Sequence, residues 1–178
     1  EMCIRDRYGA KRADVIIVTK CPEVLSEATI GHYARRIRKF SGDKPIFFSQ
    51  IKYSQPVAFG NQSSIGEKII LLTGIAKSAI LLDHSKSSFK VMEHIRYADH
   101  HPYTLNEIQS IVNRARELNA SILTTEKDMI RLLKFESHDL MKNNSWFYWP
   151  IEFIFYSFKE DFDSLILDTV KRKYSIRK

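Results

Sequence analysis

The stretch Lys68-Ile69-Ile70-Leu71-Leu72-Thr73 decides the fold class of this 178-residue chain. A short run of bulky apolar residues without polar alternation is typical of a strand buried on both faces, as in the parallel sheets of α/β proteins. Gly74 follows the run directly, and glycine permits a tight turn or a close approach of the backbone to a ligand. The run therefore predicts a central parallel strand that ends at a special loop.

Strand and helix signals alternate on both sides of this run. Alternation of this kind predicts βαβ units and a mostly parallel sheet, so we expect an α/β, Rossmann-like three-layer domain. The first strand should be buried, and the aromatic segments around Pro150 should lie at a sheet edge because proline cannot donate to a ladder. The expected strands are 14–18, 45–49, 68–73, 89–97, 121–124, 146–149 and 153–156, and the expected helices are 23–40, 79–85, 105–118, one that opens at Thr125, and 160–172.

Two segments do not fit this alternation. Residues 50–66 are polar and contain Pro56 and Gly60, which predicts a β-hairpin or a linker between strands. Residues 1–7 have no usable periodicity, and the first Met is not the first residue. We interpret the chain as cut from a longer protein, with 1–7 as a non-native segment and 8–178 as native sequence.

The main candidate for a catalytic site is Asp99-His100-His101, which lies between the strand expected at 89–97 and the capping box that opens the helix at 105. The carboxyl ends of strands are where α/β proteins place their chemistry. A carboxylate beside a histidine can fix the tautomer and raise the basicity of the ring. A turn capped by Asp99 with surface histidines fits equally well, so both interpretations stay open. A metal site would need a third ligand, which only Asp83-His84 supplies, and none is predicted.

A second motif is Thr125-Glu126-Lys127-Asp128, at the start of a helix. A capping threonine and first-turn acids explain most of it without invoking function. Lys127 is a cation in the first turn of the helix, where the helix dipole favours anions. Its presence there favours a role in binding a ligand. Structural and cleft-facing roles both stay open.

Composition narrows the class of protein. The net charge of +7 is concentrated in residues 35–39 and 171–178. These runs fit helix ends that complement the dipole, or attraction to an anionic membrane surface. Nucleic acid is not favoured, because no aromatic-interleaved basic platform accompanies the charge. There is no signal peptide, no apolar stretch of about 18 residues and no redox or metal spacing at Cys3 and Cys21, so we expect a soluble or peripheral chain in a reducing compartment.

Taken in order, residues 12–22, 72–76, 99–103 and 124–128 resemble the tetraacyldisaccharide 4'-kinases, the lipid A 4'-kinases. The resemblance runs from about Tyr8 onward and corresponds to the C-terminal half of that family. It implies the C-terminal lobe of a P-loop kinase that transfers phosphate from ATP, with Mg²⁺, to the 4'-hydroxyl of a tetraacylated glucosamine disaccharide-1-phosphate. This lipid A precursor would be met by peripheral association with the cytoplasmic face of the anionic inner membrane.

The same resemblance implies roles for individual residues. His100 matches the histidine that works with an aspartate of the other lobe to activate the attacking hydroxyl, and Asp99 would support it. Cleft or substrate-binding positions would be His101, Thr125, Glu126, Lys127 and Asp128. No Gly-x-x-x-x-Gly-Lys-Ser/Thr phosphate loop occurs in this sequence, so the chain alone should be inactive and should not bind ATP or Mg²⁺ tightly.

Three alternatives remain at this stage. The first is a Rossmann-like domain that binds a nucleotide or a sugar at its strand ends. The second is an Asp-His-His-type hydrolase, which would need further Asp and His motifs at other strand ends. The third is an interaction module that docks on membranes through its basic tail and aromatic strands.

Overall fold

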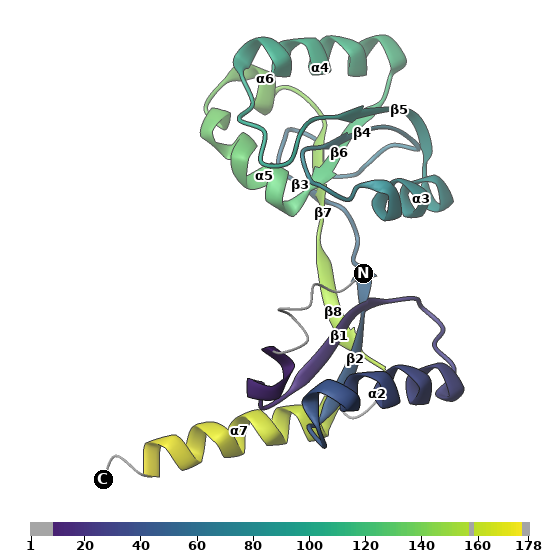
Figure 1. Cartoon of the computed structure of the whole chain (residues 1–178). Coiled ribbons are helices and arrows are strands. Elements are labelled where there is room, and N and C mark those ends of the chain that lie inside the picture. The colour runs from purple at the N-terminus through teal and green to yellow at the C-terminus, as the bar shows by residue number, and fades with distance from the viewer. Residues whose placement is uncertain (1–8, 157–158, 176–178) are drawn as a thin grey trace. The chain divides into compact units, whose positions relative to one another are not determined.

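The computed structural model describes residues 9–156 and 159–175. It divides into two compact units (Figure 1). Unit 1 consists of Glu1–Lys52 and Glu152–Lys178, and unit 2 of Tyr53–Ile151. The candidate site residues at 99–101 and 125–128 all fall in unit 2.

Unit 2 is built on a five-stranded sheet in the order β3-β7-β6-β4-β5. β4, β5, β6 and β7 pair in parallel, whereas the short β3 pairs antiparallel with β7. The strands are β3 (Val57–Ala58), β4 (Lys68–Thr73), β5 (Lys90–Arg96), β6 (Ser121–Thr125) and β7 (Trp146–Trp149), and the helices are α3 (Ala79–Ser88), α4 (Leu105–Leu118), α5 (Glu126–Leu132), the 3₁₀ turn η2 (Leu133–Phe135) and α6 (Asp139–Lys142).

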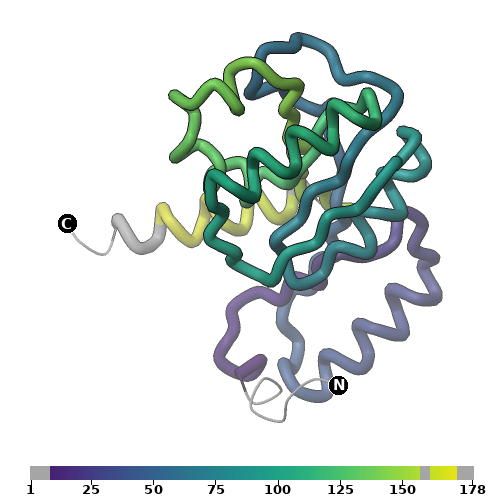
Figure 2. Tube along the Cα trace, turned by 90° about the horizontal axis from the view of Figure 1, so that it is seen from above, coloured from purple at the N-terminus to yellow at the C-terminus, as the bar shows by residue number. Residues whose placement is uncertain are grey.

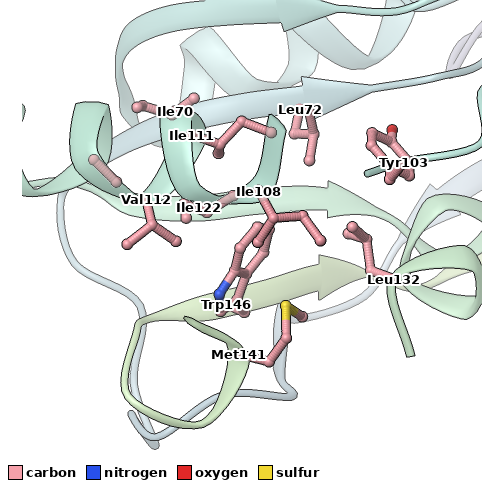
Figure 3. Packing of buried hydrophobic residues seen from close by; sticks show 11 residues of the cluster. Ile70, Leu72, Tyr103, Ile108, Ile111, Val112, Ile122, Leu132, Met141 and Trp146 are labelled. Carbon is pink, nitrogen blue, oxygen red and sulfur yellow. The ribbon is translucent and has the colours of Figure 1, made fainter. Parts of the chain in front are cut away.

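The two faces of β4 enter two separate apolar clusters, because successive side chains of a strand point to opposite faces. Ile70 and Leu72 pack on one face, beneath the apolar stripe of α4 and beside residues of α5, α6 and β7 (Figure 3). Ile69 and Leu71 pack on the other face, with Leu81 of α3. The sheet therefore has helices on both faces, and the predicted three-layer α/β fold with a mostly parallel sheet is confirmed.

Helix α4 lies over the parallel strands (Figure 2) and has well-defined ends. At its start, the Thr104 hydroxyl accepts from the Glu107 N–H while the Glu107 carboxylate accepts from the Thr104 N–H, which is the expected capping box. At its end, Asn119 adopts a left-handed conformation with φ 48°. These caps fix the segment that directly follows the Asp99-His100-His101 junction.

The chain enters and leaves unit 2 at adjacent positions. The Ser54 N–H donates to the Pro150 carbonyl over 3.1 Å. The Trp149 indole N–H donates to the Ser54 carbonyl. Rings of Tyr53 and Trp149 also pack together, with centroids 5.2 Å apart. The two ends of unit 2 are thus joined by backbone and side-chain bonds.

Unit 1 contains a three-stranded sheet in the order β1-β2-β8, in which β1 and β2 are parallel. Phe47 of β2 packs edge-on against Phe155 and Phe162, with centroids 5.8 and 5.1 Å away. The elements are the 3₁₀ turn η1 (Ala10–Arg12), β1 (Ile16–Cys21), α2 (Glu27–Ser41), β2 (Ile46–Tyr53), β8 (Ile151–Phe155) and α7 (Lys159–Ser175), of which β2 and β8 each extend by one residue into unit 2.

Three expectations about burial and position were wrong. β1 was expected to be buried, but Ile17 is 42% exposed because β1 pairs with β2 alone and lies at the edge. Of the two aromatic segments expected at a sheet edge, β8 does lie at an edge of its sheet, but β7 lies between β3 and β6, and β3 takes the edge position. The apolar spacing of the last helix predicts Ile166 and Val170 on its inner face, but both are exposed on α7.

Candidate functional site

The Asp99-His100-His101 junction is tied to the loop after β4 by backbone bonds. The Tyr97 N–H donates to the Thr73 carbonyl over 2.7 Å, and the His100 N–H donates to the Gly74 carbonyl over 3.1 Å. Because β4 and β5 are parallel neighbours, both loops leave the same edge of the sheet. The junction therefore sits at the carboxyl ends of the central strands, as expected.

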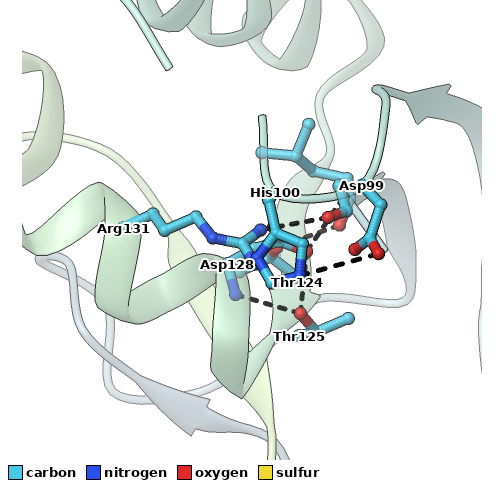
Figure 4. A network of polar contacts seen from close by, with 8 residues as sticks. Asp99, His100, Thr124, Thr125, Asp128 and Arg131 are labelled. Carbon is cyan, nitrogen blue, oxygen red and sulfur yellow. Dashed lines mark hydrogen bonds and ion pairs between the residues drawn. The ribbon is translucent and has the colours of Figure 1, made fainter. Parts of the chain in front are cut away.

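His100 combines a constrained backbone with an exposed ring. Its φ of 61° is left-handed, a conformation that costs a non-glycine residue roughly 1–2 kcal/mol. Its side chain is 80% exposed. Nδ1 lies 3.3 Å from Arg131 Nη2, and Nε2 lies 3.7 Å from Asp99 Oδ2 (Figure 4). The structure thus presents the ring to solvent from a fixed backbone, which is the arrangement expected of a group that meets a ligand.

Beneath His100 lies a fully buried carboxylate, Asp128. Its Oδ2 accepts from the Gly74 N–H over 2.9 Å and from the Thr125 hydroxyl over 2.7 Å. Its Oδ1 accepts from Arg131 Nη1 over 2.6 Å. Thr125 in turn accepts from the Asp128 N–H over 3.0 Å, as an N-cap of α5. A buried charge with this many donors is well compensated, and it locks the β4 loop to the start of α5.

Gly74 is required by this packing. A Cβ at that position would lie 2.8 Å from Asp128 Oδ1 and 2.9 Å from the Tyr103 hydroxyl. The Tyr103 hydroxyl is itself buried, beside the Asp128 carboxylate. Burial, and then the charge of Asp128, strongly raise the pKa of Tyr103, so the phenol stays protonated beside the carboxylate.

His101 has a different environment from its neighbour. Its Nε2 lies 2.8 Å from Glu107 Oε1, and its ring stacks on Tyr97 with centroids 4.3 Å apart. Desolvation raises the pKa of Glu107, but the hydrogen bonds from Thr104 and His101 outweigh it and the net pKa is lowered. His101 therefore anchors the start of α4.

The structure brings Asp99, His100, Thr125 and Asp128 together in one polar network, and His101, Glu126 and Lys127 lie beside this network without joining it. Glu126 and Lys127 are exposed on the first turn of α5. His84, considered as a metal ligand, lies in ring contacts with Tyr53 and Trp149. In the part of the chain that the structure describes, no three His, Cys, Asp or Glu side chains form a group that could hold a metal ion.

Sequence reasoning missed two residues of the site. Arg131 pairs with Asp128 three positions earlier on α5, an i, i+3 spacing that could have suggested the contact. His94 Nε2 lies 2.9 Å from the Thr73 hydroxyl at the end of β4. Desolvation, followed by the charges of Arg96 and Lys86, lowers the pKa of His94. Nothing in the local sequence marks that contact, since it joins two strands.

A cavity of about 650 Å³ opens at the opposite edge of the sheet, where Lys68, Ser121 and Ser145 stand at the amino ends of strands, and it shares no residue with the His100 site. Among residues 9–156 and 159–175, none of the helices has the length and apolar character needed to span a membrane.

Comparison with known proteins identifies the family. Residues 4–171 match the family described as tetraacyldisaccharide-1-P 4'-kinase, LpxK. Curated tetraacyldisaccharide 4'-kinases of Flavobacterium psychrophilum and Flavobacterium johnsoniae are 32% and 33% identical over 171 residues, which is 93% of this chain and 47% of each relative. The chain thus spans about half the length of the curated relatives it matches.

A solved structure shares the fold. LpxK from Aquifex aeolicus in complex with ATP superposes with a TM-score of 0.51 at 17% sequence identity, covering 89% of this chain and 43% of that one. Fold and sequence comparison agree with the resemblance carried by the four motifs, and the chain belongs to the tetraacyldisaccharide-1-P 4'-kinase family.

Proposed function

We propose that this sequence is the C-terminal part of an ATP-dependent lipid kinase that phosphorylates the 4'-hydroxyl of a tetraacylated glucosamine disaccharide-1-phosphate. Membership of the family supports the reaction class, and the names of the relatives support the acceptor. The observation that carries the site assignment is the exposed ring of His100, held on a left-handed backbone above a buried polar network.

In this proposal His100 contacts the sugar hydroxyl, and Asp99, with its carboxylate 3.7 Å from Nε2, supports the ring. Thr125 and Asp128 hold the loop and the helix that carry the site. His101, Glu126 and Lys127 border it and contribute to substrate binding. Phosphoryl transfer depends chiefly on positioning and charge neutralisation, which such a rigid site serves.

ATP and Mg²⁺ do not fit the residues of this chain. The sequence has no phosphate loop, and among the described residues there is no cluster of carboxylates for a metal. We therefore assign neither group to these residues, and we propose that the chain on its own has no kinase activity.

Peripheral attachment to the anionic inner-membrane surface at its cytoplasmic face is the proposed location. On α2, the cationic side chains of Arg35, Arg36, Arg38 and Lys39 are exposed. Each such charge near an anionic surface contributes about 1 kcal/mol. Lys171 is exposed as well, whereas the side chains of 172–178 lie outside the described residues. Sedimentation with vesicles of anionic and of neutral lipid tests this location, and equal binding to both would contradict it.

The catalytic assignment is tested in a full-length protein that carries this sequence. His100→Ala should lower kcat by about 10²–10⁴, the usual contribution of a positioned side chain that exchanges or shares a proton. The matched control is His138→Asn, which keeps a capping side chain at the start of α6 and should leave kcat unchanged. An unchanged kcat in His100→Ala would remove His100 from the mechanism.

A further inference from the structure

We infer that Arg131 is a positioning residue that keeps the neutral ring of His100 protonated on Nε2, so that His100 meets the acceptor hydroxyl as a hydrogen-bond donor. The assignment of a substrate hydroxyl rests on the proposed function. The tautomer rests on the geometry around the ring alone.

The guanidinium of Arg131 is fixed by two protein acceptors. Nη1 donates to the Gly74 carbonyl over 3.0 Å and to Asp128 Oδ1 over 2.6 Å. The side chain is 21% exposed, and its ion-pair partner is fully buried. Because Asp128 neutralises the charge and Nη1 is already occupied, the guanidinium is poorly suited to capture a substrate phosphate. Its other terminal nitrogen, Nη2, is directed at the ring of His100.

Nη2 of Arg131 determines which nitrogen of the His100 ring can hold the proton. Arg131 Nη2 lies 3.3 Å from His100 Nδ1 (Figure 4). A guanidinium has N–H donors and no acceptor, so a hydrogen bond between the two requires the lone pair of Nδ1. In the neutral imidazole the proton then resides on Nε2.

The carboxylate on the other side of the ring favours the same tautomer. Asp99 Oδ2 lies 3.7 Å from Nε2 and is an acceptor only, so it attracts an N–H and repels a lone pair. Among the described residues, the charged groups beside the ring are Arg131 at Nδ1 and Asp99 at Nε2. Both act in the same direction on the position of the proton.

This arrangement changes the chemical role available to His100. Nε2 is the ring nitrogen that does not face Arg131, and in this tautomer it offers an N–H to the oxygen of the acceptor hydroxyl. It cannot remove the proton of that hydroxyl while it carries its own. When the oxygen forms its new bond to phosphorus, its proton must pass to a carboxylate or a water outside this site.

The tautomer is measured directly by ¹⁵N NMR of the histidine-labelled chain near pH 8, which is above the ordinary histidine pKa of about 6.5. We expect His100 to show a protonated Nε2 and a hydrogen-bonded, unprotonated Nδ1. In Arg131→Met the Nδ1 signal should move to the position of a free ring nitrogen. Arg114→Met, which removes an arginine of α4 that pairs with Glu93 of β5 and Glu117 of α4, is the control and should leave His100 unchanged.

Because Arg131→Met leaves Asp128 without its cation, Arg131→Lys provides a second variant that keeps the charge and the fold. A lysine lacks the planar fork, so it cannot bond Gly74, Asp128 and His100 together. The His100 signals should move in this variant too. A proton on Nδ1 in the wild-type chain, or unchanged His100 signals in both variants, would overturn the inference.

Kinetics of the full-length protein separate the inference from the proposed function. Arg131→Lys should lower kcat by roughly ten- to a hundredfold with little change in KM, because the ring is displaced rather than the substrate site removed. An equal kcat would contradict the positioning role. A wild-type protein without kinase activity would refute the proposed function, while the NMR result on the tautomer would stand.

Discussion

Units 1 and 2 contain strands of similar composition, but the strands reach different degrees of burial. In unit 2, Ile69, Ile70, Leu71 and Leu72 of β4 are completely buried. In unit 1, β1 has the equally apolar start Ile16-Ile17-Val18 but no buried residue, and among the described residues the buried apolar side chains of this unit are Phe47 and Phe48. β4 lies between two strands with helices on both faces, whereas β1 pairs with β2 alone. Burial of an apolar strand is therefore set by its neighbours more than by its own sequence.

The largest effect on the difference between the two units is expected from removing Asp128, the buried carboxylate of unit 2. Asp128→Ala removes the carboxylate that accepts from the Arg131 guanidinium, the Gly74 N–H and the Thr125 hydroxyl, and leaves the charge of Arg131 without its partner. Breaking a buried ion pair in this way costs about 3–5 kcal/mol of unfolding free energy. Urea unfolding followed by tryptophan fluorescence reports on unit 2 alone, because Trp146 and Trp149 are the two tryptophans of the chain.

The matched control for that measurement is Asp83→Ala, which removes an exposed acid from α3. It should change the unfolding free energy by less than about 0.5 kcal/mol. Equal losses in the two variants would show that Asp128 contributes as a surface charge and not as a buried lock.

A pair of isoleucine substitutions tests the comparison between the two sheets directly. Ile70→Ala should destabilise unit 2 by about 2–5 kcal/mol, because it leaves a cavity between β4 and α4. Ile17→Ala removes the same atoms from a side chain that is 42% exposed, so its cost should be about 1 kcal/mol or less. Hydrogen exchange of the strand amides in each unit provides the measurement. Equal effects would contradict the different coverage of β4 and β1.

Two glycine substitutions test whether the loop after β4 is as closely packed as the strand itself. Gly74→Ala should cost about 1–3 kcal/mol, since its Cβ would press on Asp128 and Tyr103. Gly66→Ala is the control, because a Cβ there would meet the Ser121 hydroxyl at an ordinary 3.5 Å. Thermal unfolding compares the two, and a Gly74→Ala variant as stable as Gly66→Ala would mean that the loop relaxes freely.

The smallest expected effect is a pH dependence confined to unit 2. Burial and the neighbouring Arg96 and Lys86 lower the pKa of His94, so the folded unit resists protonation of this ring more than the unfolded chain does. The stabilisation is fully present above the ordinary value of 6.5 and is lost as the pH falls below it toward the lowered folded value. His94→Gln should flatten the pH dependence of the fluorescence-detected stability below about pH 6.5, and an unaltered slope would assign that dependence to other groups.

Much of the fold could be predicted from the sequence where local signals and tertiary context agree. β4 and α4 have the predicted bounds, because an uninterrupted apolar run and a capped amphipathic stripe are local patterns. The position of β7 could not be predicted, since it depends on which strand β3 pairs with. The exposure of Ile166 and Val170 could not be predicted either, because helix periodicity shows which residues share a face but not what covers that face.

The candidate site was predictable in part. Asp99, His100 and the Thr125–Asp128 motif were recognisable as strand-end and helix-start residues. Their convergence through Gly74 was not predictable, because Gly74 and Asp128 are 54 positions apart and meet only through strand pairing. The different environments of His100 and His101 also depend on tertiary contacts, since adjacent residues of one type are distinguished only by their partners Arg131 and Glu107.

The bonded ends of unit 2 have a consequence for how this protein can be rearranged. Ser54 and Pro150 are joined by a backbone hydrogen bond, so the segment between them begins and ends at one place. A segment whose two ends are adjacent is suited to domain insertion and to circular permutation. It can be transplanted between these two positions, or closed there and reopened at the exposed turn 136–138, with every strand of the five-stranded sheet kept in one piece.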